Sequence, residues 1–104
     1  MKLLTKELIA KFPSLYKTEN QKDPLIICRF FTIWNNWEWY PIEFDGKDTF
    51  FGWVRGLEDE LGYFSLAELE SIRGTWGLTI ERDIAFTPIR QSELKKRMEV
   101  ASRS

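Results

Sequence analysis

The chain has 104 residues, of which 43% are hydrophobic and 30% charged, a balance typical of a globular protein and not of a disordered one. It contains no histidine and a single cysteine, which excludes an intrachain disulfide, the usual Cys/His zinc sites and every histidine-dependent catalytic triad. Residues 1–22 and 90–104 each carry five bases against two acids, whereas residues 23–89 carry five bases against twelve acids, and such an acidic body disfavours nonspecific binding to duplex nucleic acid.

We expect one domain over residues 1–104, in which residues 90–104 form a basic C-terminal helix or tail. No apolar run reaches the roughly 18 residues of a membrane span. Charges at Lys6, Glu7 and Lys11 interrupt any signal-peptide core. We therefore expect a cytoplasmic protein without a membrane partner.

The N-terminal part predicts a short helix followed by a polar loop. Thr5 is suited to cap the helix, and Pro13 ends it at or before Phe12, because the residue before a proline avoids the α-helical region. Residues 14–24 follow as the loop. Its expected anchors to the core are Leu15 and Tyr16.

The middle of the chain predicts two consecutive β-hairpins, with strands at residues 25–34, 37–44 and 49–55. Asn35–Asn36 is expected to form the first turn, because asparagine tolerates the positive φ angles of a two-residue turn. Asp45–Asp48 is expected to form the second turn. Pro41 cannot donate a hydrogen bond to a neighbouring strand, so we expect a β-bulge there.

Shorter elements are expected in the C-terminal half. Residues 57–61 predict a helical turn that Gly62 closes. Ser65 and Glu68 match a capping box, which begins a helix running to about Arg73. The remaining expected elements are a strand at residues 83–87 and a short helix that begins near Ser92 and places Leu94 and Met98 on one side.

Ten of the sixteen aromatic residues lie between Phe30 and Trp53, more than one apolar sheet face requires. Side chains alternate between the faces of a strand, so the expected turns fix which residues share a face. The expected cross-strand pairs are Trp34 with Trp37, Thr32 with Trp39, Phe44 with Thr49, Tyr40 with Trp53 and Glu38 with Arg55. The expected core face carries Ile27, Arg29, Phe31, Ile33, Glu38, Tyr40, Ile42, Phe44, Phe51, Trp53 and Arg55, with the charged residues pairing at its rim. The tryptophan-rich face carries Cys28, Phe30, Thr32, Trp34, Trp37, Trp39, Glu43, Phe50 and Val54.

Three interpretations of the tryptophan-rich face are open. Helices can cover both faces of the sheet, which makes every aromatic residue structural. The face can instead bind another protein, because tryptophan and tyrosine anchor interfaces; its residues would be Trp34, Trp37 and Trp39, with Asp45 and Asp48 at the rim. Lastly, the three tryptophans and the basic ends of the chain can bind single-stranded nucleic acid by stacking its bases. The acidic body counts against this third interpretation.

The carboxylates of Glu43, Asp45 and Asp48, with Lys47 between them, resemble the ligand set of a Mg²⁺-dependent hydrolase. Asp-Gly-Lys-Asp is also an ordinary turn sequence, in which aspartate caps the turn and glycine takes a positive φ. We therefore expect no catalytic residue, no metal and no cofactor. Two further polar features are expected to be structural: Cys28 as a small core residue, and Glu81–Asp83 as an ion-pair anchor.

The segment EFDGKDTFFGWVRGLEDELGYFSLAELESIRG, residues 43–74, has LLTKEL before it and ERDIAFTP after it. With these motifs the chain resembles, from about Lys2 to Pro88, a family of small bacterial, plasmid and phage proteins catalogued only as a domain of unknown function. The resemblance implies a compact prokaryotic domain carried by mobile elements. It transfers no activity and no catalytic residue.

Together these observations predict an α+β fold, in which consecutive hairpins form a mainly antiparallel sheet of three to four strands with two or three helices packed on it. The leading functional hypothesis is a non-enzymatic interaction or modulator protein of mobile-element origin that binds a host or element-encoded protein. The alternatives are a single-stranded nucleic-acid-binding module and, less favoured, a Mg²⁺-dependent hydrolase. The sequence predicts neither the identity of the partner nor the oligomeric state.

Overall fold

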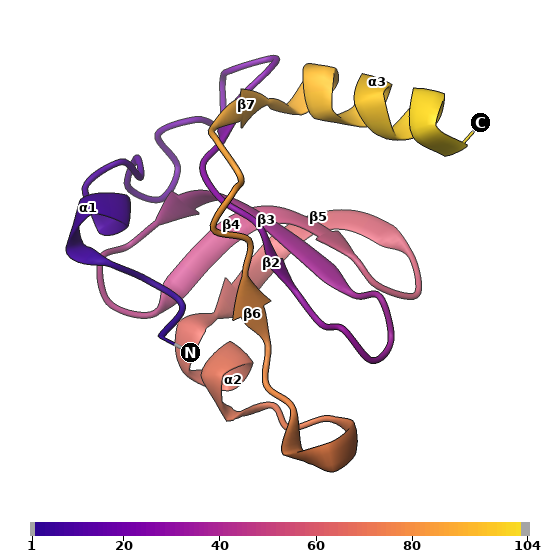
Figure 1. Cartoon of the computed structure of the whole chain (residues 1–104). Helices are drawn as coiled ribbons and strands as arrows, with labels where there is room; N and C mark the ends of the chain where they lie inside the picture. Colours follow the sequence, from indigo (N-terminus) through magenta and orange to yellow (C-terminus); the bar gives the residue numbers. More distant parts are fainter. Residues whose placement is uncertain (1, 103–104) are drawn as a thin grey trace.

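The computed structural model describes residues 2–102, which form an antiparallel five-stranded sheet of order β5-β4-β3-β2-β6 and a two-stranded sheet of β1 and β7 (Figure 1). The strands are β1 (Leu25–Ile26), β2 (Phe30–Phe31), β3 (Glu38–Phe44), β4 (Thr49–Arg55), β5 (Asp59–Ser65), β6 (Glu81–Arg82) and β7 (Ile89–Arg90). The helices are α1 (Lys6–Ile9), α2 (Leu66–Ser71) and α3 (Gln91–Ser102), with a 3₁₀ turn η1 at Thr75–Gly77. The predicted α+β class and antiparallel sheet are confirmed, and the larger sheet has one strand more than the upper number expected.

The N-terminal segment follows the prediction in its helix and departs from it in its loop. Thr5 caps α1, since its hydroxyl accepts a hydrogen bond from the Leu8 N–H at 3.1 Å. Loop 14–24 is held by Thr18, which is buried, whereas the side chain of Tyr16 is 61% exposed. The expectation that Tyr16 anchors this loop in the core is therefore wrong. Its backbone takes a positive φ of 70°, which is uncommon outside glycine.

The single long strand predicted over residues 25–34 is wrong, because the chain changes sheets within it. β1 pairs with β7, whereas β2 pairs with β3 and β6. The connection to β3 is also longer than the predicted two-residue turn, so Phe30 lies opposite Trp39 in place of Thr32. This register shift of two residues leaves every side chain on its predicted face, because the side-chain period of a strand is two.

The predicted β-bulge at Pro41 is confirmed, since the register of β3 against β4 shifts between Pro41 and Glu43. Before the bulge, the predicted pairs of Glu38 with Arg55 and of Tyr40 with Trp53 are present. Beyond it, the prediction that pairs Phe44 with Thr49 is wrong, and Phe44 lies opposite Phe50. One extra residue in a strand exchanges the faces of those that follow. Phe44 therefore joins the tryptophan-rich face, and Glu43 moves to the other.

Two elements predicted in the C-terminal half are wrong. The residues expected to form a helical turn at 57–61 belong to a hairpin, and β5 pairs with β4 in constant register from Asp59 to Ser65. Pairing along a whole strand overrides the local helix preference of the acidic segment. The strand predicted at 83–87 is a loop between β6 and β7.

The caps of the two later helices are side chains of Ser65 and Asp23. Ser65 caps α2, as expected, by accepting a hydrogen bond from the Glu68 N–H at 3.2 Å. α2 ends at Ser71, two residues earlier than expected. α3 begins at Gln91, one residue before the expected cap. Asp23, from the loop, accepts hydrogen bonds from both the N–H and the hydroxyl of Ser92, so it ties the start of α3 to loop 14–24.

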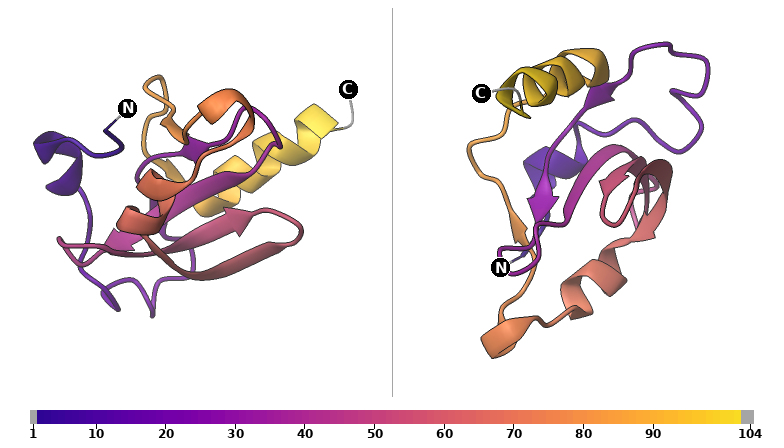
Figure 2. Two further views of the ribbon diagram at one scale, coloured as in Figure 1. Left: turned by 90° about the horizontal axis from the view of Figure 1, so that it is seen from below. Right: turned by 90° about the vertical axis from the view of Figure 1, so that its right-hand side faces the viewer.

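Hydrophobic clusters lie on both faces of the sheet, with α2 on one side and α3 on the other (Figure 2). The first cluster consists of Leu3, Leu4, Cys28, Phe30, Trp39, Phe44, Phe50, Leu69 and Ile80. The second consists of Ile26, Tyr40, Ile42 and Trp53, and the side chains that pack on it include Leu94 and Met98 of α3, as expected.

The tryptophan-rich face is covered by neighbouring segments. Trp39 is buried, and Trp34 and Trp37 are half-buried against the first cluster. Two glycines allow this close packing, because a Cβ on Gly74 would overlap the indole of Trp34 and one on Gly56 would overlap that of Trp37. Trp39 is therefore part of the core, whereas Trp34 and Trp37 pack on it and keep part of their side chains exposed.

Candidate functional site

The side chains singled out from the sequence lie in two separate places. Trp34, Trp37 and Trp39 belong to or pack on the first hydrophobic cluster, as described above. Asp45 and Asp48 lie in and next to the turn between β3 and β4. The structure does not bring the two groups together on one open surface.

Hydrogen bonds within the protein occupy both aspartates of this turn. One oxygen of Asp45 accepts bonds from the backbone N–H groups of residues 47–49, at 2.8, 2.8 and 3.1 Å, and these bonds hold the pKa of Asp45 below its usual value. Asp48 accepts a bond from the Ser65 hydroxyl at 2.6 Å and one from the Ala67 N–H at 2.7 Å. Within residues 2–102 no group of three or more Asp, Glu, Cys or His side chains is placed to hold a metal ion.

An open apolar surface lies over β4 and β5, on the face of the sheet opposite to the tryptophan-rich face. Because these strands pair in constant register, their side chains stand in rows, with Trp53 opposite Leu61 and Phe51 opposite Tyr63. Leu61 is 53% exposed and Tyr63 55% exposed. Tyr16 adds a third exposed side chain, since its ring centroid lies 6.4 Å from that of Tyr63. We call this surface, with the two hollows that meet at Leu61, the β5 groove.

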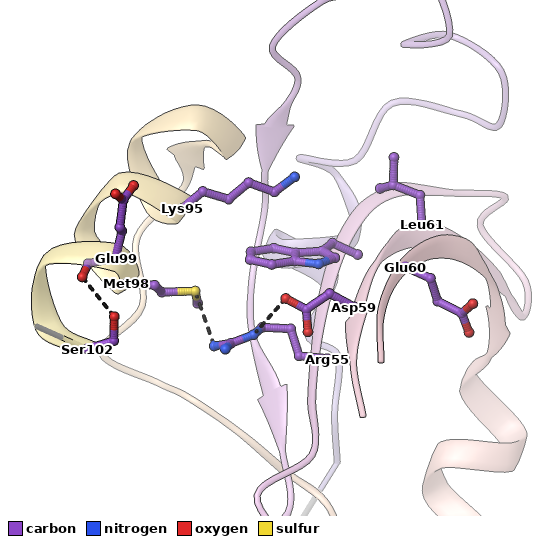
Figure 3. Close-up of a pocket in the computed structure, with 9 residues that line it drawn as sticks. Arg55, Asp59, Glu60, Leu61, Lys95, Met98, Glu99 and Ser102 are labelled. Atoms are coloured by element: carbon purple, nitrogen blue, oxygen red, sulfur yellow. Dashed lines mark hydrogen bonds and ion pairs between the residues drawn. The ribbon is translucent and has the colours of Figure 1, made fainter. Parts of the chain in front are cut away.

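The wide hollow, of about 590 Å³, lies between α3 and the hairpin of β4 and β5 (Figure 3). Two cations lie over the indole of Trp53: Lys95 Nζ is 5.0 Å from the ring centroid, and Arg55 Cζ is 5.6 Å from it. Met98 of α3 accepts a hydrogen bond at its Sδ atom from Arg55 Nη1, at 3.2 Å. The contact of Lys95 with the Trp53 ring and that of Met98 with Arg55 thus join α3 to the sheet at this end of the groove.

The deep hollow, of about 290 Å³, lies on the other side of Leu61, and loop 14–24 and the first residue of α3 form part of its wall. Glu43 lines this hollow and is 2% exposed. One carboxylate oxygen accepts a bond from the Tyr16 N–H at 2.9 Å, and the other accepts bonds from the N–H and the hydroxyl of Thr18 at 2.8 and 2.5 Å. Glu43 therefore holds the loop that forms one wall of the hollow.

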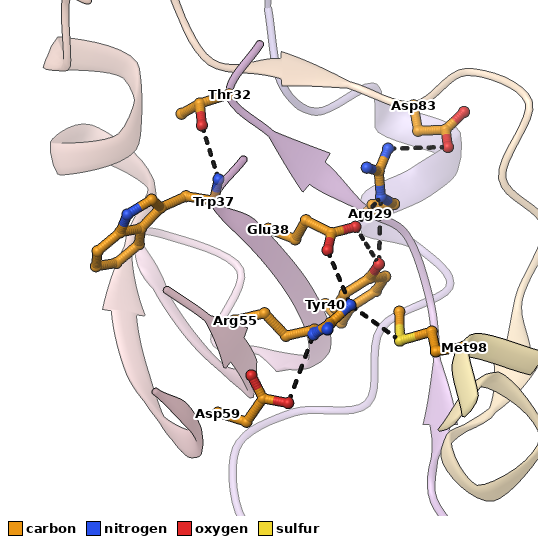
Figure 4. Close-up of polar contacts among 9 residues, drawn as sticks. All are labelled: Arg29, Thr32, Trp37, Glu38, Tyr40, Arg55, Asp59, Asp83 and Met98. Atoms are coloured by element: carbon orange, nitrogen blue, oxygen red, sulfur yellow. Dashed lines mark hydrogen bonds and ion pairs between the residues drawn. The ribbon is translucent and has the colours of Figure 1, made fainter. Parts of the chain in front are cut away.

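Next to the wide hollow, a chain of ion pairs crosses the sheet (Figure 4). Its members alternate in charge, and the distances are 3.3 Å from Asp83 to Arg29, 2.8 Å from Arg29 to Glu38, 3.1 Å from Glu38 to Arg55 and 3.5 Å from Arg55 to Asp59. The pairing predicted for Arg29, Glu38 and Arg55 is confirmed. The prediction that Asp83 takes part in an ion pair is confirmed as well.

Two buried groups near the sheet titrate well outside the neutral range. The hydroxyl of Tyr40 donates a hydrogen bond to Glu38, and burial together with that carboxylate raises the pKa of Tyr40. Burial in the first hydrophobic cluster raises the pKa of the Cys28 thiol to about 12. A thiol in this state is not a nucleophile at neutral pH, which agrees with the expected structural role of Cys28.

Sequence reasoning missed the exposed residues of β5. Leu61 lies within the expected helical turn, and Gly62 is a typical residue to end such a turn. The alternation from Leu61 to Phe64 was the signal for a strand, since Leu61 and Tyr63 point to one face and Phe64 packs on the first cluster.

These features define an α+β domain in which a five-stranded antiparallel sheet carries an open groove beside its edge strand. The chain belongs to the family described as a protein of unknown function (DUF2958), which matches residues 3–104. This match confirms the family resemblance carried by the motifs of residues 43–74. No curated protein and no solved structure matches the chain. None of the helices within residues 2–102 has the length and apolar character needed to cross a membrane.

Proposed function

We propose that this protein is a non-enzymatic interaction protein that binds an extended segment of another protein in the β5 groove. The observation that carries the proposal is the cluster of large exposed side chains formed by Tyr16, Leu61 and Tyr63. Contiguous exposed apolar patches mark interaction sites, and tyrosine is enriched among the residues that dominate binding energy.

The position of β5 supports an extended partner. β5 is the last strand on its side of the sheet, so one edge of its backbone is available to another strand. Natural edge strands are commonly protected by charged side chains, proline or a bulge. β5 carries two charged residues, Asp59 and Glu60, at its start, whereas residues 61–65 contain no charge and no proline and pair with β4 without a bulge. A partner segment that adds to this edge gains backbone hydrogen bonds, and its alternate side chains reach the groove.

The expected biological setting forms part of this proposal. We infer a cytoplasmic protein carried by bacterial, plasmid or phage mobile elements, whose partner is a host or element-encoded protein that it modulates. The motif resemblance of residues 43–74 supports this setting.

Single-stranded nucleic acid is the competing ligand for the same surface. The rings of Tyr16, Phe51 and Tyr63 offer faces on which bases can stack. The same hollow carries the carboxylates of Glu19 and Glu43 against one lysine, Lys22. This net negative charge disfavours a phosphate backbone and so favours the protein partner.

Site-specific photo-crosslinking tests the proposal. A photoreactive phenylalanine analogue is placed at Tyr63, and at Trp76 as a control, because Trp76 is 94% exposed in η1 and lies outside both hollows of the groove. In cells that naturally produce the protein, we expect the analogue at Tyr63, and not the one at Trp76, to capture a defined protein. The identified partner is then purified for affinity measurements.

With the purified partner, Leu61→Ser is expected to weaken binding at least about tenfold, a loss of about 1.4 kcal/mol. The matched control is Ile84→Ser, at another exposed aliphatic position, and is expected to leave the affinity unchanged. Equal affinities for the two variants would refute the groove as the interface. Tight, salt-sensitive binding of an oligonucleotide that Tyr63→Ala abolishes would establish the competing function instead.

A further inference from the structure

We propose that the deep hollow of the β5 groove is a binding site for one guanidinium or alkylammonium group. In the cell this group would be an arginine or lysine side chain of the bound segment, and to that extent the inference rests on the proposed function. Four observations support it: a buried carboxylate, aromatic walls, an unpaired amide and the size of the hollow.

The buried carboxylate is that of Glu43. Its oxygens accept three hydrogen bonds, one from the N–H of Tyr16 and two from the N–H and the hydroxyl of Thr18. No ion pair within residues 2–102 involves Glu43, so its charge has no cationic partner. A carboxylate has about four acceptor positions, which leaves one for a further donor. A buried charge without a counter-ion is costly, and a bound cation would remove that cost.

Aromatic rings form part of the wall of the same hollow. Tyr16, Phe51 and Tyr63 line the hollow, and the centroid of the Tyr63 ring lies 5.1 Å from that of Phe51. The faces of such rings attract cations, an attraction that strengthens where water is excluded. The combination of ring faces with a buried carboxylate favours a cationic guest over a neutral or anionic one.

The third observation is an unpaired amide in the wall. Gln91, the first residue of α3, is 9% exposed, and its Nε2 is buried without a hydrogen-bond partner within the described residues. A buried polar group without a partner is costly, so this amide favours a guest that can hydrogen-bond. Because Nε2 is a donor, its partner has to be an acceptor, which a backbone carbonyl of the segment that carries the cationic side chain can supply.

The remaining charges around the hollow agree with a cationic guest. Glu19, Lys22 and Glu43 line it, which leaves one negative charge in excess. The positive end of the α3 helix dipole would oppose a cation, but Asp23 already occupies it through its two bonds to Ser92. The volume of about 290 Å³ lies at the lower limit for small-molecule sites, about 300 Å³, and so suits a single side chain.

Titration with blocked amino acids tests the site without the unknown partner. The probes are N-acetyl-arginine amide and, as its uncharged counterpart, N-acetyl-glutamine amide. The readout is the backbone amide NMR signals of Tyr16 and Thr18, which contact Glu43. We expect saturable shifts with the arginine probe, with a dissociation constant in the millimolar range, and at least fivefold weaker binding of the glutamine probe. Absent shifts, or equal affinities for the two probes, would overturn the inference.

Variants assign the binding to this hollow. Tyr63→Ala is expected to weaken binding of the arginine probe at least fivefold. Tyr63→Phe keeps the ring and is expected to bind the probe with the affinity of the natural protein. Glu58→Gln, at an exposed position outside both hollows, is the charge control and is expected to have no effect. Glu43→Gln removes the central charge and is expected to abolish binding; if this variant does not fold, the two Tyr63 variants decide the question. Binding that survives Tyr63→Ala unchanged would refute the site.

The two proposals can fail independently. Crosslinking of a partner at Tyr63 without any binding of the arginine probe would leave the interaction function standing and remove the cation site. Binding of the arginine probe without a partner at Tyr63 would establish the cation site and remove the proposed function.

Discussion

Replacing Glu38 with glutamine is expected to lower the free energy of unfolding by about 2–3 kcal/mol. The Glu38 side chain is 18% exposed and accepts hydrogen bonds from Arg29 Nε at 2.8 Å, from Arg55 Nη1 at 3.1 Å and from the Tyr40 hydroxyl. A glutamine of the same shape keeps one acceptor oxygen but turns an N–H donor toward the other donors. The side chains of Arg29 and Arg55 are 25% and 35% exposed, so water offsets part of the loss, and the value falls below the about 3–5 kcal/mol of a fully buried pair.

Urea unfolding followed by tryptophan fluorescence measures this loss. The matched control is Glu58→Gln, at an exposed position in the turn between β4 and β5, and it is expected to change the free energy of unfolding by no more than about 0.5 kcal/mol. For a chain of this length each kcal/mol corresponds to a change of about 4–8 °C in the melting temperature. Indistinguishable unfolding midpoints for the two variants would refute the idea that the ion-pair chain stabilises the sheet.

Three further predictions concern other parts of the molecule. Gly74→Ala forces a methyl group into the indole of Trp34 and is expected to lower the free energy of unfolding, measured by calorimetry, by about 1–3 kcal/mol. Gly62→Ala, which has open space around it, is the control. Burial raises the pKa of the Cys28 thiol to about 12, so iodoacetamide at mildly alkaline pH is expected to modify it far more slowly in the folded protein than in urea; equal rates would contradict its burial. Hydrogen bonds from the hydroxyl and the N–H of Ser92 hold the pKa of Asp23 below its unfolded value of about 3.9, so this contribution to stability is fully present above that pH and is lost as the pH falls through the lower, folded pKa. The Ser92 amide NMR signal is expected to report this acid transition, which Asp23→Asn should remove.

The hairpin of β3 and β4 could be predicted from the sequence because the information that specifies it is local. Alternating side chains, the Asp-Gly turn and the proline that enforces a bulge all lie within residues 37–55. The break between β1 and β2 could not be predicted in this way. Residues 25–34 form one apolar run, and the strands that divide it, β6 and β7, pair with it across 50 residues or more.

The candidate site was harder to predict because exposure depends on what covers each face. The density of tryptophan drew attention to Trp34 and Trp37, yet two glycines let those rings pack tightly against the chain. The aromatic side chains that line the β5 groove in exposed positions are Tyr16 and Tyr63, and both lie outside the aromatic run. Tyr63 belongs to a strand that becomes recognisable only through its pairing with β4.

The order of strands in the sheet has a consequence for how the protein folds. β3, β4 and β5 are joined by short turns, so their pairing carries a small loop-closure entropy, whereas Leu25 pairs with Arg90 across 65 residues. The three-stranded meander can therefore form early, and the pairing of β1 with β7 comes late. That late step brings Pro24 to Gln91 and completes the wall of the deep hollow. A guest held there would stabilise the last contacts to form, so the occupied protein should unfold more slowly than the empty one.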